Sequence, residues 1–206
     1  MLELDHVFCF VEPDGTWADQ LAAAGWHLDE GVSHTGQGTR NRRLFWPEQY
    51  LELLWLDDLD EARGNPLRLD RRSDWARAGT SPFGLGLRGK LPPDQLEHYW
   101  LYEDLGIPLW VHRDNERNPD RPFLFVHEAE ADELEALRPR TRVHSLPSHR
   151  LHGTLTAVHL SGPSPAAVPP HRGPPIRQRR GPHRMRLVVG TSGGTLTVSD
   201  LLTFNG

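Results

Sequence analysis

Apolar and polar residues alternate at the start of the chain in a pattern typical of a β-strand. The run at residues 2–11, LELDHVFCFV, places His6 and Phe8 on one face and Asp5 and Val7 on the other. A titratable group on a face that is otherwise apolar needs a partner, because burying an unpaired charge is costly. The first strand therefore supplies a fold element and a candidate functional residue together.

The pattern that follows predicts a strand–helix–three-strand unit that occurs twice. In residues 1–56 the later elements are a helix at 17–24 and strands at 26–29, 42–46 and 50–56. In residues 82–130 strands are predicted at 83–88, 107–112 and 123–126, with a helix from Pro92 to about residue 105. The charged residues 57–81 are predicted to form a surface connection. The fold class predicted is α+β, built from two βαβββ modules.

The last third of the chain predicts a partial third module. Residues 129–137 favour a short helix, and strand-like runs occur at 151–161 and 185–198. Between these runs, residues 162–184 consist largely of proline, arginine, histidine and glycine. Prolines prevent a regular helix there, and few apolar residues are available for a core, so we expect a disordered segment. The predicted domains are 1–131 and 132–206.

Composition narrows the class of protein. The 206 residues carry a net charge of -5, so broad binding to nucleic acid phosphates is not expected. Cys9 is the one cysteine, which rules out an internal disulfide and favours a reducing compartment. No signal peptide and no apolar run long enough to cross a membrane are apparent. We expect a cytoplasmic protein.

The best candidate site lies in residues 31–56, where a glycine-punctuated loop precedes two strand-like runs. The run at residues 50–54, YLELL, places Glu52 between apolar neighbours. His6 is the best candidate partner for the Glu52 carboxylate. Imidazole and carboxylate together suit zinc, iron, manganese or nickel, and a carboxylate can also poise a histidine as a base. The alternative is a residual buried ion pair without a function.

Polar residues of the glycine loop are candidate ligands for a substrate. His34, Thr39 and Asn41 can exchange hydrogen bonds with a small molecule at the mouth of a pocket, and Arg42 can hold a carboxylate or phosphate. The plainer alternative is a turn that needs glycine for positive φ and Asn and Thr for its own backbone. For the arginine, the alternative is a solvated strand edge.

Several segments together resemble the glyoxalase-like domain family of the vicinal oxygen chelate superfamily. They are LDHV at 4–7, HTGQGTRNR at 34–42, YLEL at 50–53, PFGLGL at 82–87 and RPFL at 121–124. The resemblance implies paired βαβββ modules whose mixed sheet curls into a half-open cup. It also implies a divalent metal held by a histidine from a first strand and a glutamate or histidine from a last strand of each module.

Carried onto this chain, that ligand pattern matches His6 and Glu52 in the first module and departs from it in the second. Aligning residues 123–128 with 50–55 puts Phe125 opposite Glu52, and a glycine or apolar residue falls opposite His6. His127 could substitute only if the strand register shifts.

Two functions follow as expectations. One is a metal-dependent lyase, isomerase or dioxygenase acting on a small oxygenated substrate, with His6 and Glu52 as catalytic and metal-binding residues. The other is a metal-free protein that sequesters a small molecule, as resistance-type members of the superfamily do; a degenerate structural member is a third possibility. The expected partners are a small-molecule ligand and a second copy of the chain in a homodimer, with no nucleic acid and no membrane.

Overall fold

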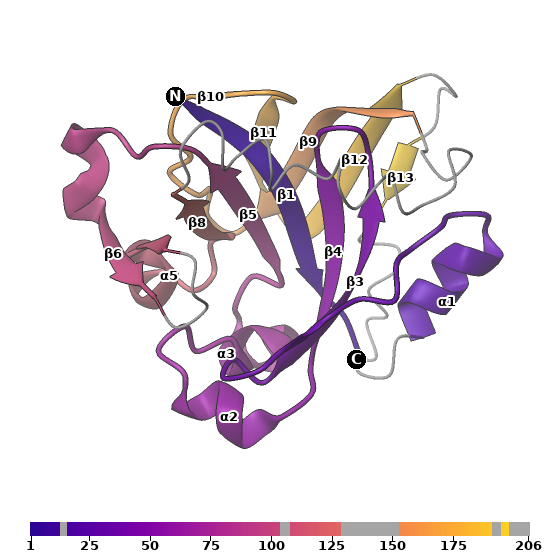
Figure 1. The fold of residues 1–206 in the computed structure, drawn as a ribbon, viewed down its shortest axis with the longest axis horizontal. Helices are drawn as coiled ribbons and strands as arrows, with labels where there is room; N and C mark the ends of the chain where they lie inside the picture. The colour runs from indigo at the N-terminus through magenta and orange to yellow at the C-terminus, as the bar shows by residue number, and fades with distance from the viewer. Residues whose placement is uncertain (13–15, 104–107, 129–152, 191–194, 198–206) are drawn as a thin grey trace.

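The computed structural model describes residues 1–12, 16–103, 108–128, 153–190 and 195–197, which form two β-sheets with short helices around them (Figure 1). The predicted helix at 129–137 lies outside these residues. So does the boundary between the predicted domains. In the part of the chain that is described, no helix has the length and apolar character needed to span a membrane.

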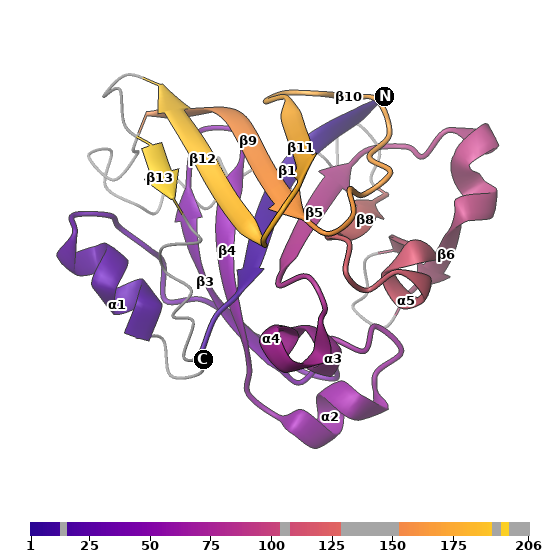
Figure 2. The same ribbon diagram turned by 180° about the vertical axis from the view of Figure 1, so that it is seen from behind.

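The first predicted module is present. It consists of β1 (Leu2–Phe10), α1 (Thr16–Ala23), β2 (Ser33–His34), β3 (Thr39–Phe45) and β4 (Tyr50–Leu56). The strand predicted at 26–29 is reduced to a single bridge between Leu28 and Leu44. The connection to the second module contains α2 (Leu59–Gly64), α3 (Asp70–Ser73) and α4 (Trp75–Ala78). These helices gather at one end of the sheet (Figure 2).

The second module keeps the plan but changes its helix. It consists of β5 (Phe83–Arg88), the 3-10 helix η1 (Pro93–His98), β6 (Tyr99–Tyr102), β7 (Leu109–His112), α5 (Asp114–Arg117) and β8 (Phe123–His127). The prediction of one helix from Pro92 to about residue 105 is therefore wrong for residues 99–102, and its last two residues lie outside the described part of the chain. The YWLY run instead pairs antiparallel with β7, because aromatic residues favour a pleated, half-buried surface.

The two modules meet in the middle of one curled mixed sheet, with strand order β2-β3-β4-β1-β5-β8-β7-β6. Strands β1 and β5 pair antiparallel at the centre, while β4 runs parallel to β1 and β8 parallel to β5. This arrangement confirms the predicted α+β fold of paired modules around a cup.

A β-bulge in β1 decides which side chains face the cup. The register with β5 shifts between Leu4 and His6, so Asp5 is an extra residue on this strand. The bulge changes the alternation, and Leu2 and Leu4 pack into the core on the opposite side of the sheet from His6. The prediction that Asp5 faces away from His6 is wrong, because the Asp5 side chain bonds to the His6 ring.

The C-terminal segment forms a second sheet. Its elements are β9 (Thr154–Gly162), β10 (His171–Arg172), β11 (Ile176–Arg180), β12 (Arg184–Gly190) and β13 (Thr195–Thr197). The strand order is β11-β9-β12-β13, while β10 joins the first sheet beside β1. In Figure 2 this sheet lies across the face of β1 and β4.

The expectation that residues 162–184 are disordered is wrong, since β10 and β11 lie within them. Prolines cannot donate a backbone hydrogen bond, but their carbonyls still accept: Val158 N donates to Pro175 O at 3.0 Å and Ser161 Oγ to Pro182 O at 2.6 Å. The Gln178 side chain bonds both the N–H and the carbonyl of Ala166. These contacts add to the parallel pairing of β11 with β9.

The second sheet buries the convex side of the first and leaves the concave side for a ligand. Its apolar residues share one core with Val7 and Cys9 of β1; they are Leu155, Val158, Leu160, Met185, Leu187 and Val189. Cys9 therefore faces away from the pocket, and burial raises the pKa of its thiol above the usual range.

Two glycines of β5 make room for the side chains of β1. Gly84 pairs with Phe8 and Gly86 with His6. A Cβ atom on Gly84 would lie 2.0 Å from the Phe8 ring, and one on Gly86 would lie 2.5 Å from the His6 ring. Both rings therefore lie across the backbone of β5.

We expect Gly84→Ala to lower the free energy of unfolding by about 1–3 kcal/mol, because the buried Phe8 ring would have to move. Chemical denaturation measures this change. Gly64→Ala is the matched control, since no atom lies within 4 Å of a Cβ atom there. Equal stability of the two variants would contradict the proposed packing.

Candidate functional site

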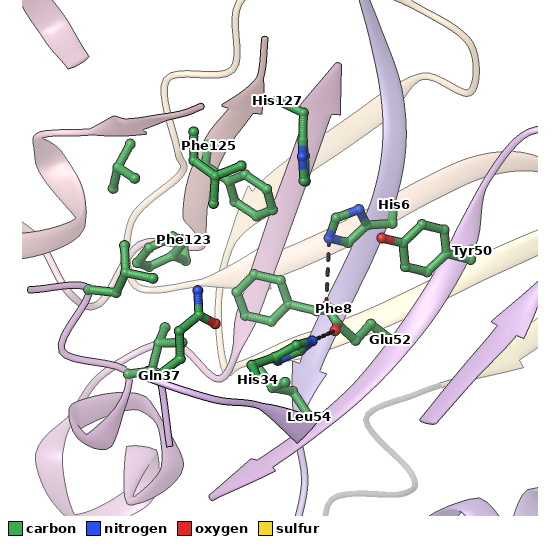
Figure 3. Close-up of a pocket in the computed structure, with 14 residues that line it drawn as sticks. His6, Phe8, His34, Gln37, Tyr50, Glu52, Leu54, Phe123, Phe125 and His127 are labelled. Atoms are coloured by element: carbon green, nitrogen blue, oxygen red, sulfur yellow. Dashed lines mark ion pairs between the residues drawn. The ribbon is translucent and has the colours of Figure 1, made fainter. Parts of the chain in front are cut away.

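A pocket opens on the concave side of the first sheet, between β1, β4 and β8 (Figure 3). Its volume is about 130 Å³. The apolar lining consists of Phe8, Leu54, Leu67, Leu69, Leu109, Val111, Phe123 and Phe125, and the polar lining of His6, His34, Gln37, Tyr50, Glu52 and His127. Most of the polar groups gather at one end, around His6 and Glu52.

His6 and Glu52 face each other across β1 and β4. His6 Nε2 lies 3.6 Å from Glu52 Oε2, and the two side chains are only 3% and 10% exposed. The strand register explains the approach, because Phe8 pairs with Glu52 and His6 with Tyr50 two residues earlier. The structure thus brings together the two residues that the sequence singled out.

Asp5 fixes the orientation of His6. Its Oδ2 atom lies 2.7 Å from His6 Nδ1, so the opposite ring nitrogen is left facing the pocket. Arg88 Nη1 donates to the other oxygen of Asp5 at 2.9 Å and also pairs with Glu3. Burial opposes ionisation of Asp5, but the bond to His6 and the nearby cations outweigh burial and hold its pKa below the usual range. Asp5 is a buried carboxylate that stabilises a proton on His6 Nδ1.

Asn41 orients the Glu52 side chain by a hydrogen bond, as Asp5 orients His6. Its side-chain N–H group donates to Glu52 Oε1, and its Oδ1 accepts from Val32 N at 2.8 Å. The same amide nitrogen lies 3.3 Å from His34 Nε2, and His34 Nδ1 lies 3.0 Å from Thr39 Oγ1. Of the loop residues predicted to bind substrate, only His34 lines the pocket. Thr39 and Asn41 hold the side chains that do.

Arg42 does not reach the pocket. Its Nε donates to Asp29 O at 3.0 Å and its Nη1 to Asp19 at 3.0 Å. Alternation along β3 places Asn41 on the concave side and Arg42 on the other. Contrary to our expectation, the Arg42 contacts lie on the side of the sheet away from His6.

His127 reaches the site from the second module without any change of register. In β8 it lies two residues beyond Phe125, so both line the pocket. Its ring centroid is 6.0 Å from that of His6, and the two residues offer ligand atoms within 4.8 Å of one another. Burial lowers the pKa of His127 to about 4, so the ring is neutral at pH 7. The expectation that His127 needed a register shift is wrong.

Aromatic rings hold the polar end of the pocket in place. The Tyr50 ring stacks on His6 at 4.4 Å between centroids, and Phe125 contacts the other side at 5.4 Å. Gln37, which sequence reasoning missed, lies in the turn between β2 and β3. That turn is close to α2, because Gly38 N donates to Glu61 at 2.7 Å. Its only sequence signal was the pair of flanking glycines.

The donor set fits a divalent metal ion. Two ligands each about 2.1 Å from a tetrahedral zinc lie about 3.4 Å apart, close to the 3.6 Å between His6 Nε2 and Glu52 Oε2. A carboxylate on the far nitrogen of a histidine is the usual support of a metal ligand. His127 adds a second neutral imidazole nearby. The ligand atoms that lie within 4.8 Å of one another belong to Asp5, His6 and His127, so Asp5 is the carboxylate closest to both histidines.

We expect Asn41→Ala to lower the free energy of unfolding by about 1–3 kcal/mol, because Glu52 loses a donor and the Val32 N–H loses its acceptor inside the protein. Thermal or chemical denaturation measures the loss. Arg40→Ala on the same strand is the control, since Arg40 is exposed and should change stability by no more than about 0.5 kcal/mol. The role assigned to Asn41 is wrong if both variants are as stable as the parent.

Comparison with known proteins agrees with this geometry. Residues 4–88 match the model of the glyoxalase-like domain family. No curated protein matches the chain. Among solved structures, a hypothetical protein from Staphylococcus aureus is 13% identical, covering 79% of this chain and 70% of its own, with a TM-score of 0.44.

Two methylmalonyl-CoA epimerases are also similar. A variant from Streptomyces coelicolor is 16% identical over 64% of this chain and 97% of its own, with a TM-score of 0.44. The enzyme from Mycobacterium tuberculosis is 16% identical over 65% and 91%, with a TM-score of 0.40. These likenesses are weak, so the assignment rests on the family match and on the topology. Residues 4–88 therefore match the glyoxalase-like domain family, which agrees with the resemblance seen in the sequence.

Proposed function

We propose that this protein is a glyoxalase-like enzyme that binds a divalent metal ion through His6 and Glu52 and acts on a small oxygenated substrate. The observation that carries the proposal is the geometry of His6. Its Nδ1 is held by Asp5 at 2.7 Å, while its Nε2 faces Glu52 Oε2 at 3.6 Å inside a pocket. The reaction type is of the lyase, isomerase or dioxygenase class, in a reaction that develops negative charge on an oxygen of the substrate.

When bound, the metal would supply a Lewis acid for that oxygen. Residues of the chain would hold the ion and surround the substrate. His6 and Glu52 hold the ion, His127 is a further donor, and Asn41 keeps the second oxygen of Glu52 occupied. The aromatic lining, which includes Phe125 beside His6, excludes water and receives the apolar part of the substrate.

A second candidate is a metal-free protein that sequesters a small apolar or aromatic molecule. The observation in its favour is the second module, where Phe125 and Gly86 stand in the places in which ligands were expected. The pocket of about 130 Å³ is close to the roughly 150 Å³ of an apolar cavity that binds benzene. In this case His6 and Glu52 form a buried acid–base pair.

Metal content tests the first candidate function. We expect the untagged protein to contain a divalent metal (zinc, iron, manganese or nickel) near one ion per chain by elemental analysis. Glu52→Ala and Glu52→Gln should lose it, whereas Glu30→Ala, at an exposed position, should keep it. Circular dichroism of each variant verifies that it folds.

Two outcomes would favour the second candidate instead. Parent protein without metal, even after incubation with divalent ions, would refute the metal-dependent enzyme. Binding of a small aromatic compound that a chelator leaves unchanged would then support sequestration. A parent whose metal survives both substitutions of Glu52 would place the ion at some other site.

The next prediction concerns Asp5. We expect Asp5→Asn to weaken metal binding about 10- to 100-fold, because the bond that orients His6 loses its charge. Glu3→Gln is the matched control, since Glu3 also pairs with Arg88 but does not touch His6. Titration calorimetry with the metal measures both. If Glu3→Gln weakens binding as much as Asp5→Asn, the effect comes from overall charge and Asp5 has no positioning role.

A further inference from the structure

We propose that the ligand of this protein carries a phosphoryl group, which binds in a second cavity lined by arginines while the oxygenated end of the ligand reaches His6 and Glu52. The identity of the reacting end rests on the function proposed above. The phosphoryl site rests on separate observations, and the experiment below tests it independently.

The second cavity adjoins the first. Its volume is about 440 Å³, and it lies between the connection that carries α3 and the segment that carries α5. Leu67, Val111 and Phe123 line both cavities. A ligand too long for the first cavity can therefore extend past these three side chains into the second.

The second cavity is strongly cationic. Four arginines line it, namely Arg68, Arg71, Arg72 and Arg113, and Glu116 is the one acidic residue in its lining. The protein as a whole carries a net charge of -5, so the positive charge of this lining is opposite in sign to the net charge of the chain. Clefts lined by one sign of charge attract ligands of the opposite sign.

Arg72 is the most informative of these residues. It is only 2% exposed, and it donates to the carbonyls of Ser81, Arg121 and Asn115 at 2.9–3.3 Å. Within the described part of the chain, it forms no ion pair with a carboxylate. Burial lowers the pKa of Arg72 to about 9, with the charge of Asp120 acting the other way, so the group is still charged at pH 7. A buried cation held by neutral carbonyls leaves a positive potential in the cavity.

The other arginines of the cavity differ in how many of their side-chain donors are already bonded to the protein. Arg68 is occupied by a two-point contact with Asp70 at 3.0 Å. Arg113 is exposed and donates from Nε to Glu97 O at 3.2 Å, so its terminal nitrogens are left over. Arg71 is exposed, and its side chain makes no hydrogen bond or ion pair with the described residues. Arg71 and Arg113 are therefore the groups that can close on a bound anion.

The number of arginines and the size of the cavity favour a phosphoryl group over a carboxylate. One guanidinium group satisfies a carboxylate with two parallel hydrogen bonds, whereas a phosphoryl group offers three oxygens and more charge. Phe123 joins the two cavities, because the Arg72 guanidinium lies 5.1 Å above its ring and the Phe8 ring lies 6.0 Å away. The ligand class that fits is an apolar or planar group between an oxygenated end and a phosphoryl end.

The test uses phenyl phosphate, phenol, benzoate and pyrophosphate as probes in titration calorimetry. The full-length protein is kept metal-free with a chelator, so that metal binding by pyrophosphate does not interfere. We expect phenyl phosphate to bind more tightly than phenol or benzoate. The double variant Arg71→Ala with Arg113→Ala should weaken phenyl phosphate and pyrophosphate at least about tenfold. Arg77→Ala, at an exposed arginine outside both cavities, should leave both unchanged.

The outcomes separate this inference from the proposed function. Phenyl phosphate binding that the double variant leaves unchanged, or that benzoate matches, would overturn the phosphoryl site whether or not the protein holds a metal. Loss of pyrophosphate binding in the double variant but not in His6→Ala would support the site. This result would support the phosphoryl site even if the protein proved to bind no metal. Only the proposed metal-dependent enzymatic role would then be rejected.

Discussion

The hydrogen bond between Asp5 and His6 is the contact on which the whole site depends. It exists because a bulge in β1 turns Asp5 toward the concave side and reverses the alternation of the strand. The same reversal sends Leu2 and Leu4 into the core beneath the second sheet. The bulge therefore serves both layers. It sends the apolar start of β1 into the core, and it brings the Asp5 carboxylate to the His6 ring.

The two modules contribute unequal parts to the pocket. The first supplies a chain of polar contacts from Thr39 through His34 and Asn41 to Glu52. The second supplies glycines that let the rings of β1 lie flat, an aromatic wall and one histidine. Because the polar groups are concentrated on one side, the proposed ligand would place its oxygenated end against β1 and β4 and its apolar part against β8.

Much of this arrangement was predictable from the sequence, and the failures have physical causes. Alternation and the lone charge among apolar residues were enough to pair His6 with Glu52. The bulge was invisible, because a one-residue shift in pairing depends on the partner strand and leaves no mark in the pattern of one strand. The Pro-rich segment appeared disordered because its composition opposes regular structure. Its order comes from the pairing of β11 with β9, from accepting proline carbonyls and from Gln178, and these partners meet only in the folded chain.

Pairing of the two modules within a single chain has a consequence of its own. His6 and Glu52 come from one module and His127 from the other, yet β1 and β5 join them side by side in the same molecule. The wall, the histidines and the carboxylate are thus covalently linked through the intervening 57–82 connection. Within the described residues, the pocket therefore draws its aromatic wall, its histidines and its carboxylate from one molecule.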